Sequence, residues 1–285
     1  MAFTVTQIKA IQTKLKSLGY YTGVVDGIFG TYTLTAVKAF QKAKGLAVDG
    51  VVGPVTAKAL GLTSVLFPTV TPTPVAVDEV GYFINRVWNP LENIDWAGLK
   101  AKGINAVYIR CAEENLTAIS AYLPAIKAAG LKPYAWTWMG FTMHKEAIAA
   151  GWNICYDLET YNMANYYEEI KSLYAMCKVA GKTFILCTKA QDWDGDMKWS
   201  VIKDYCDYLM PMLYLGDYGK TVDQLTTYMK TMNTKYPNKI YPALETYKSD
   251  ANPVKKDLAV LKAEMVACDP YCKGIALFRY GLTPL

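Results

Sequence analysis

From residue 79 to the C-terminus, short apolar runs alternate with longer stretches whose apolar residues recur every three or four positions. The short runs have the length of buried β-strands and lie at 80–88, 105–111, 132–138, 153–158, 182–188, 208–214, 239–244 and 274–279. The helical stretches lie between them, most clearly at 95–102, 118–129, 164–180, 221–236 and 253–267. This alternation predicts an α/β fold, a (β/α)₈ TIM-type barrel. A doubly wound open sheet is the alternative, but no glycine-rich phosphate loop supports it.

The first 62 residues carry a different pattern, which combines helical periodicity with an internal repeat. One apolar stripe consists of Ile8, Ile11, Leu15 and Leu18, spaced three or four residues apart. The repeat is a pair of Asp-Gly loops, each followed by an apolar helical run, and its loop residues are Asp26, Gly27, Gly30, Asp49, Gly50 and Gly53. Asp-Gly favours a turn because glycine accepts positive φ and aspartate bonds its own backbone. We therefore expect a small domain of three helices with two matching loops.

A change of composition separates these two patterns. The stretch from residue 63 to 77 has no charged residue and contains three prolines that alternate with threonine and valine. Such a composition favours extended backbone and is typical of a semi-rigid spacer. We therefore predict a helical domain at 1–62, a Pro/Thr-rich linker at 63–78, and a barrel at 79–285.

The helical domain resembles the family of peptidoglycan-binding domains. The residues that carry this resemblance, besides the two Asp-Gly loops, are Gln12, Leu15, Gly19-Tyr20, Phe40-Gln41 and Gly45-Leu46. The resemblance implies that the domain docks cell-wall glycopeptide in a shallow groove near the loop residues named above. A generic helical bundle is the alternative interpretation.

The charge distribution agrees with a wall-binding role for this domain. Residues 1–62 hold seven lysines and two aspartates, whereas the rest of the chain holds 23 basic and 23 acidic residues. The whole excess of +5 therefore lies on the small domain, and a basic surface attracts anionic polymers in a salt-dependent way. Nucleic acid is not expected as a partner, because the chain shows no recognition helix, zinc motif or aromatic–basic interleaving. No long apolar segment predicts insertion into a membrane.

Polar and aromatic side chains at the carboxyl ends of the predicted strands mark the candidate active site of the barrel. On the fourth strand, Asp157 and Glu159 are two residues apart and face the same side, so their mutual repulsion favours a proton on one of them. The other candidates at strand ends are Arg110, Glu113, Trp136, Trp138, Tyr214, Asp217, Glu245 and Arg279. Acids can cleave a glycosidic bond, and aromatic faces can stack on sugar rings. The pattern therefore predicts a sugar-binding site.

The barrel resembles glycoside hydrolase family 25, the lysozyme-like N-acetylmuramidases of phage endolysins. The motifs that carry the resemblance are Ile94-Asp95-Trp96, Gly103-Ile104, Val107-Tyr108-Ile109-Arg110 and Ala129-Gly130-Leu131-Lys132-Pro133. It implies that Glu159 is the general acid. The first strand offers only Asn85 where that family has an acidic residue, which favours the alternative of a wall-binding protein with an inactive barrel.

The barrel is also similar in part to the chitinase-like family 18. Asp157 and Glu159 match the last two acids of that family's fourth-strand motif, and Met212-Leu213-Tyr214 matches its sixth-strand motif. This resemblance implies that Glu159 protonates the leaving oxygen while Asp157 and Tyr214 orient the substrate's own N-acetyl group as the nucleophile. In a third geometry, Glu159 and Glu245 are the acid and nucleophile of a retaining enzyme, about 5–5.5 Å apart. All three readings share Glu159 as the acid.

Other chemistry finds less support in the sequence. The chain has one histidine, His144, so neither a catalytic triad nor a zinc site is expected, and we predict no cofactor. The acidic cluster Asp192, Asp194 and Asp196 could bind Ca²⁺ by its spacing, but we interpret it as a solvated loop because it lacks the remaining ligands of an EF-hand. Of the seven cysteines, Cys111, Cys155 and Cys187 lie in apolar runs and are interpreted as buried small apolar residues.

The N-terminal residues have no basic start and no apolar core of a secretion signal, so we expect synthesis in the cytoplasm. Together these patterns predict a cell-wall lytic glycoside hydrolase, released in the manner of a phage endolysin, whose small domain holds it on the wall. The sequence leaves the scissile bond and the oligomeric state open.

Overall fold

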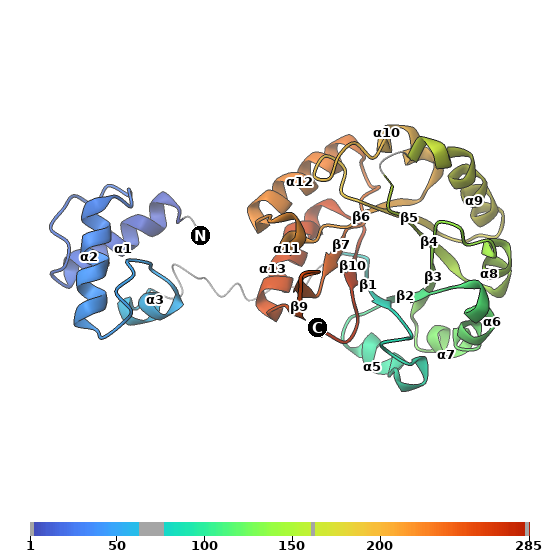
Figure 1. Ribbon diagram of the computed structural model, residues 1–285, viewed down its shortest axis with the longest axis horizontal. Coiled ribbons are helices and arrows are strands. Elements are labelled where there is room, and N and C mark those ends of the chain that lie inside the picture. The colour runs from blue at the N-terminus through green and yellow to red at the C-terminus, as the bar shows by residue number, and fades with distance from the viewer. Residues whose placement is uncertain (1–2, 63–76, 161–162, 283–284) are drawn as a thin grey trace. The chain divides into compact units, whose positions relative to one another are not determined.

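The computed structural model describes residues 3–62, 77–160, 163–282 and 285 (Figure 1). The chain divides into two compact units, a helical one that contains residues 3–62 and a larger one that contains residues 77–285. Each is described by itself. The predicted linker at 63–78 lies almost entirely outside the described residues.

The N-terminal unit contains three helices, α1 (Val5–Ser17), α2 (Thr31–Ala43) and α3 (Pro54–Leu60), which confirms the predicted small helical domain. Its core is formed by one apolar stripe from each helix, and the fully buried members are Ile11, Leu15, Val37, Phe40, Ala57 and Leu60. The edge of the Tyr20 ring meets the Phe40 ring at a centroid distance of 5.5 Å. The apolar periodicity along the chain thus becomes the single core of this unit.

The second unit is a barrel of eight parallel strands, as predicted (Figure 1). The strands are β1 (Glu79–Ile84), β2 (Ala106–Arg110), β3 (Lys132–Trp138), β4 (Asn153–Leu158), β5 (Phe184–Thr188), β6 (Tyr208–Pro211), β7 (Ala243–Glu245) and β10 (Gly274–Phe278). Their order in the sheet is β6-β5-β4-β3-β2-β1-β10-β7. Parallel bridges Leu209↔Ile240 and Met212↔Ala243 join the first and last of these strands, so the sheet closes on itself.

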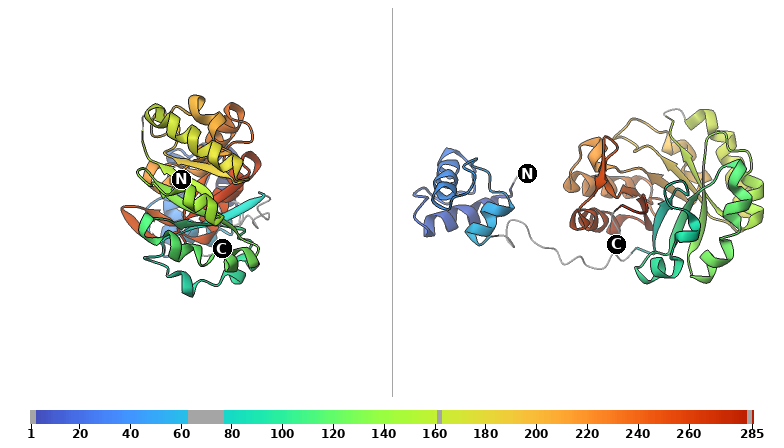
Figure 2. Two further views of the ribbon diagram at one scale, coloured as in Figure 1. Left: turned by 90° about the vertical axis from the view of Figure 1, so that its right-hand side faces the viewer. Right: turned by 60° about the horizontal axis from the view of Figure 1, so that its bottom comes forward.

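Helices surround the strands, as the views in Figures 1 and 2 show. They are α5 (Trp96–Ala101), α6 (Leu116–Ser120), α7 (Leu123–Ala128), α8 (His144–Ala150), α9 (Tyr167–Val179), α10 (Trp199–Ile202), α11 (Leu215–Tyr218), α12 (Val222–Lys235) and α13 (Leu258–Cys268). Short 3₁₀ turns lie at Leu91–Asn93, Glu113–Asn115, Met163–Tyr166, Lys203–Tyr205 and Asp269–Tyr271. The strands are buried on both faces, which explains why they read as continuous apolar runs.

One predicted helix is partly wrong. Residues Asn252–Lys255 form strand β9, which pairs antiparallel with β8 (Tyr247–Ser249), and helix α13 begins only at Leu258. The helix begins there because the Asp257 side chain accepts a hydrogen bond from the backbone N–H of Ala259 and so caps it. The β8–β9 hairpin therefore follows β7 at the carboxyl end of the barrel strands.

Two further boundaries differ from the prediction for local reasons. Strand β1 ends at Ile84 because the Asn85 side chain accepts a hydrogen bond from the backbone N–H of Val87, at 3.0 Å, and turns the chain. The stretch predicted as one helix at 118–129 is broken into α6 and α7, and proline stands in the first turn of α7.

Aromatic rings fill the interior of the barrel. Tyr108 stacks on Tyr134 and on Phe83, each at a centroid distance of 4.7 Å. At the amino ends of the strands, Glu79 accepts a hydrogen bond from the Tyr241 hydroxyl at 2.8 Å and pairs with Lys132 at 3.3 Å. Packing therefore fills the interior as far as the amino ends, which leaves the carboxyl ends of the strands for a site.

Within the described residues, none of the helices combines the length and the apolar character needed to cross a membrane.

Candidate functional site

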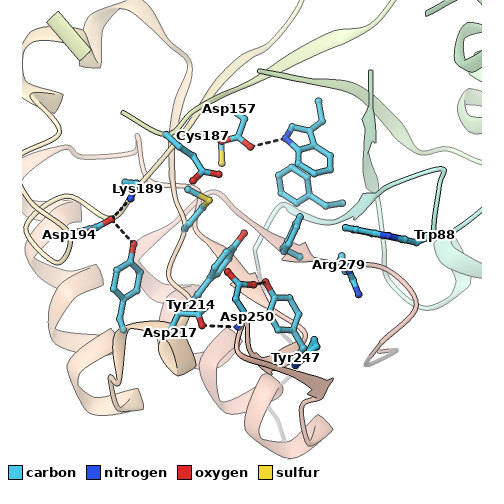
Figure 3. Close-up of a pocket in the computed structure, with 17 residues that line it drawn as sticks. Trp88, Asp157, Cys187, Lys189, Asp194, Tyr214, Asp217, Tyr247, Asp250 and Arg279 are labelled. Atoms are coloured by element: carbon cyan, nitrogen blue, oxygen red, sulfur yellow. Dashed lines mark hydrogen bonds and ion pairs between the residues drawn. The ribbon is translucent and has the colours of Figure 1, made fainter. Parts of the chain in front are cut away.

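A cavity of about 560 Å³ lies at the carboxyl ends of the barrel strands (Figure 3). Its lining comes from strand ends, from α11 and from the β8–β9 hairpin, and consists of Phe83, Trp88, Trp136, Asp157, Glu159, Cys187, Lys189, Asp194, Met212, Tyr214, Asp217, Tyr218, Tyr247, Asp250, Pro253, Phe278 and Arg279. The volume falls in the range of sites that hold a small ligand. Six residues predicted from the sequence meet here, namely Asp157, Glu159, Tyr214, Trp136, Asp217 and Arg279.

Asp157 is the more deeply placed of the two carboxylates on β4. The indole N–H of Trp136 donates a hydrogen bond to its Oδ2 at 3.0 Å, while Oδ1 is buried and has no hydrogen-bond partner in the described part of the chain. Burial raises the pKa of Asp157 to about 7, and the nearby charge of Glu159 adds to the increase. The hydrogen bond from Trp136 opposes it. Asp157 therefore keeps a proton close to neutral pH.

Glu159 lies two residues further on, just after the end of β4, and its side chain is exposed to the cavity. Across the residues that the structure describes, its carboxylate has no ion pair and no hydrogen bond from another side chain. The even spacing along the strand places it on the same side as Asp157. The pair thus consists of a half-buried acid and an exposed acid that line the same cavity.

The base of the cavity is a set of aromatic rings in mutual contact. Phe83 meets Trp136 at a centroid distance of 5.1 Å, and Trp136 meets Phe278 at 5.8 Å. Phe278 stacks on Tyr214 at 5.7 Å, with 17° between the ring planes, and meets the edge of Tyr247 at 6.1 Å. We call these five residues the aromatic floor. Burial raises the pKa of the Tyr214 hydroxyl well above its usual range, so it stays protonated.

Charged side chains surround this floor, and most of them already have protein partners (Figure 3). Lys189 pairs with Asp194 at 3.1 Å. Asp217 accepts a hydrogen bond from the backbone N–H of Asp250 at 2.8 Å, and the Tyr247 hydroxyl donates to the Asp250 carboxylate at 2.7 Å. These bonds join α11 to the β8–β9 hairpin and make them one wall of the cavity.

Four predicted site residues of the barrel lie outside the cavity lining, and the first three are Arg110, Trp138 and Glu113. The Arg110 guanidinium lies 5.0 Å from the centroid of the Trp138 ring, so these two side chains pack on each other. Glu113 accepts a hydrogen bond from the backbone N–H of Thr142 at 2.8 Å, which holds the pKa of its carboxyl below the usual value. A position at the carboxyl end of a strand places a residue at the same end of the barrel as the cavity. The direction of its side chain then decides whether it reaches the cavity.

Glu245, the last residue of β7, also lies outside the lining and is fully buried. Its Oε1 accepts hydrogen bonds from the backbone N–H of Gly216 at 2.7 Å and from Lys256 Nζ at 3.1 Å. Lys256 Nζ also lies 2.9 Å from Glu264 Oε2. Burial raises the pKa of Glu245 to about 7, against the opposing charge of Lys256. This carboxylate binds the elements behind the cavity wall together.

Several lining residues were missed by the sequence analysis, above all Trp88, Lys189, Tyr247 and Asp250. Trp88 lay within a predicted strand, whereas the strand ends earlier and leaves this side chain 51% exposed at the cavity. Tyr247 and Asp250 belong to a hairpin whose second strand was read as a helix. Only Trp88, as an exposed aromatic residue after a strand, had a local signal that could have identified it.

The acidic cluster after β5 forms three separate ion pairs. Asp192 pairs with Lys235 at 2.9 Å, and Asp196 pairs with Lys198 at 2.6 Å. Asp194 is the partner of Lys189 described above. In the ranges that the structure describes, no three His, Cys, Asp or Glu side chains are placed to hold a metal ion.

The lone histidine and the cysteines belong to the packed interior. His144 Nε2 lies 3.0 Å from the Thr137 hydroxyl, and burial lowers the pKa of this histidine to about 4. All seven cysteines are free thiols, and six of them are buried. Neither His144 nor any cysteine other than Cys187 lines the cavity.

The predicted wall-binding residues form two equivalent hydrogen-bonded loops. In the first, the buried Gln12 donates from Nε2 to Asp26 Oδ1 at 2.7 Å, and its Oε1 accepts from the backbone N–H of Gly27 at 2.9 Å. In the second, Gln41 makes the same two bonds to Asp49 and Gly50, at 2.7 and 2.8 Å. The middle glycines have φ of +83° and +77°, a conformation that favours glycine.

These contacts give the loop residues a structural role. The pKa values of Asp26 and Asp49 are lowered, first by a backbone N–H donor two residues on and then by the glutamine. The final glycines, Gly30 and Gly53, are the N-caps of α2 and α3. Ile28 and Val51, which directly follow the middle glycines of the two loops, are 67% and 61% exposed. The polar loop residues hold these apolar side chains in solvent.

Comparison with known proteins supports the predicted family of the N-terminal unit. Residues 4–60 match the family described as "Putative peptidoglycan binding domain". The chain is 45% identical over 53 residues to the N-acetylmuramoyl-L-alanine amidase CwlM of Mycobacterium tuberculosis, which is 19% of this chain and 13% of that protein. It is 48% identical over 50 residues to a spore cortex-lytic enzyme of Bacillus cereus, which is 18% of this chain and 19% of that protein.

These relatives share only the N-terminal segment with this chain, and the chain spans less than one fifth of the length of either. Among solved structures, tryptophan synthase of M. tuberculosis matches with 11% identity and a TM-score of 0.34, over 71% of this chain and 83% of that one. Such a likeness is too low to support an inference. The resemblance of the barrel to glycoside hydrolase families 25 and 18 therefore stays a prediction.

Proposed function

We propose that this protein is a cell-wall hydrolase whose N-terminal unit binds wall glycan and whose barrel cleaves a glycosidic bond beside an N-acetylated sugar. The observation that carries the proposal is the Asp157–Glu159 pair at the edge of the aromatic floor. One acid is half-buried and keeps a proton near neutral pH, while the other is exposed at the cavity. The floor offers the faces on which sugar rings stack.

Glu159 is the proposed general acid. Its carboxyl group would donate a proton to the glycosidic oxygen as the bond between that oxygen and the anomeric carbon breaks. Asp157 is less accessible than Glu159, because it is half-buried and accepts a hydrogen bond from Trp136. Its role in the proposal is to share the proton of the pair and to accept a hydrogen bond from the substrate.

The position of Glu245 favours the acetamido group of the substrate as the nucleophile. Glu245 does not line the cavity and its Oε1 is bound to Gly216 and Lys256, so a double displacement by Glu159 and Glu245 finds no support. Tyr214 and Asp157 lie with Glu159 in the cavity. We propose that they orient the acetamido group, whose oxygen attacks the anomeric carbon, and that water then opens the cyclic intermediate.

Attachment to the wall is assigned to the N-terminal unit. Support comes from its family match, from its net charge of +5, and from relatives that are named as an amidase and a cortex-lytic enzyme. Binding through a separate unit raises the effective concentration of the wall at the barrel without adding a contact at the cavity.

One observation favours a second candidate, a wall-binding protein with an inactive barrel. Strand β1 contributes Phe83 to the cavity and no acid, and Asn85 is buried in the turn that follows. In this alternative, the cavity binds the glycan without cleaving it.

Fragments released from purified walls decide between the two. We expect Glu159→Gln to lower release by roughly 10²–10⁴-fold while wall binding is unchanged. Glu113→Gln, which alters an exposed acid outside the cavity, is the matched control and should keep full activity. Mass spectrometry of new reducing ends identifies the sugar at the cleaved bond. Release of stem peptides from intact glycan would contradict the glycosidase, and binding without release would favour the inactive barrel.

A further inference from the structure

A tryptophan and an arginine form a stacked pair on one side of the cavity, away from Asp157, Cys187 and Lys189 (Figure 3). The guanidinium carbon of Arg279 lies 3.8 Å from the centroid of the Trp88 ring. Both residues line the cavity, although Trp88 follows β1 and Arg279 follows β10. The backbone of Arg279 is fixed on both sides, because its N–H donates to the Thr246 hydroxyl at 3.0 Å and its carbonyl accepts from that hydroxyl at 2.7 Å.

Among the described residues, Arg279 differs from Lys189, the other cation of the cavity lining, in having no charged partner. Lys189 pairs with Asp194. In the part of the chain that the structure describes, the Arg279 guanidinium has no ion pair and no hydrogen bond, and its only contact of note is the Trp88 ring. An indole face attracts a cation but leaves the N–H groups at the guanidinium edge unused. Trp88 therefore holds the guanidinium of Arg279 in place and leaves its N–H donors available to a ligand.

The chemistry of the donors indicates what they bind. A guanidinium presents its N–H groups in a planar fork that matches a carboxylate with two parallel hydrogen bonds. Trp88 is 51% exposed, so it offers an uncovered ring at the cavity rim as well as support for Arg279. A ligand that lies on the aromatic floor and carries a carboxylate toward this rim would satisfy both groups.

We propose that Arg279, supported by Trp88, makes the cavity selective for N-acetylated glycans that carry a carboxylate over neutral glycans of the chitin type. This inference rests on the proposed function and names its substrate class. The carboxylate can come from the lactyl group of an unsubstituted muramic acid or from a stem peptide attached to it. Arg279 is a specificity-determining residue in this account, because the proton transfers belong to Glu159 and Asp157.

The distribution of tryptophan allows binding at the barrel to be measured in the full chain. All seven tryptophans lie at residue 88 or beyond, and the N-terminal unit has none. Tryptophan fluorescence therefore reports on the barrel even if the N-terminal unit also binds the ligand. The measurement uses the full chain with Glu159→Gln, so that the glycan is not consumed.

Four probes separate the possible ligands. The first is a peptide-free tetrasaccharide of alternating N-acetylglucosamine and N-acetylmuramic acid, and the second is the same glycan with its carboxylates methyl-esterified. The third is the tetrasaccharide of N-acetylglucosamine, and the fourth is a muropeptide. We expect the first to bind at least tenfold more tightly than the second and third. If the fourth exceeds the first, the stem peptide supplies the carboxylate.

Arg279→Gln should weaken binding of the carboxylate-bearing probe by about ten- to a hundredfold and leave binding of the neutral tetrasaccharide within twofold. Arg279→Lys keeps the charge but not the fork, so we expect an intermediate loss. The matched control is Arg86→Gln, because Arg86 is exposed, follows the same strand as Trp88 and lies outside the cavity lining. It should change neither affinity.

Two results would overturn the inference and leave the proposed glycosidase intact. One is equal affinity of the Glu159→Gln protein with intact Arg279 for the acid and its methyl ester. The other is an equal loss for charged and neutral glycans in Arg279→Gln, which would mean that Arg279 only shapes the rim. If no glycan binds the barrel and wild-type protein releases no fragment from walls, the inference and the proposed function both fail.

Discussion

At the scale of single residues, burial separates two carboxylates that are chemically alike. Asp157 and Glu159 share one face of β4, but only Asp157 is covered by Trp136 and the neighbouring strands. The cost of placing charge in that environment raises the pKa of Asp157 to about 7. The same burial that raises this pKa therefore destabilises the folded protein once the proton is lost.

This cost predicts a pH dependence of stability that one substitution should remove. The Asp157 carboxyl titrates near 3.8 in the unfolded chain and near 7 in the folded one, so its contribution to stability falls as pH rises between these values and is constant above them. Asp157→Asn keeps an acceptor for Trp136. It should become more stable than wild type as pH rises from 4 to 8, by up to about 4 kcal/mol.

Urea unfolding of the two proteins at pH 4.5, 6 and 8 measures the difference. Asp78→Asn is the control, because Asp78 is exposed and far from the pair in the barrel sequence, and its curve should follow that of wild type. Parallel stability curves for Asp157→Asn and wild type would show that Asp157 does not hold its proton in the folded state.

At the scale of elements, the wall of the cavity depends on a buried charge network behind it. Glu245 on β7 binds the N–H of Gly216 in α11 and the amine of Lys256, which reaches Glu264 on α13. A methyl group on Gly216 would collide with the carbonyl oxygen of Lys248 in β8, so α11 and the hairpin are in close backbone contact. Three elements thus meet at one lysine.

Removing that lysine should destabilise the barrel strongly. Lys256→Met leaves two acids buried without a cation, which costs about 3–5 kcal/mol in comparable cases. Adding Glu245→Gln and Glu264→Gln removes the buried charge and should recover most of the loss. Urea unfolding followed by tryptophan fluorescence reports the barrel alone. Lys255→Met, on the exposed neighbouring position, should have little effect, and an equal effect of both lysines would show that the network contributes nothing.

At the scale of the whole molecule, charge and chemistry are divided between two units. The N-terminal unit has a net charge of +5 and the rest of the chain has none, while the cavity with its carboxylate pair lies in the barrel. If the proposed function is correct, attachment to the wall and cleavage of the glycan should respond to different conditions. Attachment should weaken with salt, because screening shortens the reach of surface charge from about 10 Å at 0.1 M to about 3 Å at 1 M.

Deleting residues 1–62 tests this division. We expect the shortened protein to lose activity on insoluble walls by roughly 10²-fold at low salt and to retain activity on a soluble peptide-free glycan. The loss should shrink at 1 M salt, where wild type also binds weakly. Reducing ends released from both substrates provide the measurement. Equal losses on insoluble and soluble substrates would mean that the N-terminal unit supports the barrel itself.

Local periodicity along the chain was enough to predict two features of the fold and one of the site. The alternation of apolar runs and helical stretches was sufficient for the eight-stranded barrel, and the repeated Asp-Gly loops were sufficient for the N-terminal family. The spacing of Asp157 and Glu159 placed both on one face of a strand, because side chains alternate along any strand.

Long-range packing, in contrast, determines which strand-end side chains share the cavity. It placed Arg279 on Trp88, turned Arg110 toward Trp138, and buried Glu245 against Lys256. It also placed the start of the helix predicted at 253–267 in strand β9. These outcomes depend on the closure of the barrel and on contacts between residues far apart in the chain, and a local pattern of apolar and polar positions contains no information about either.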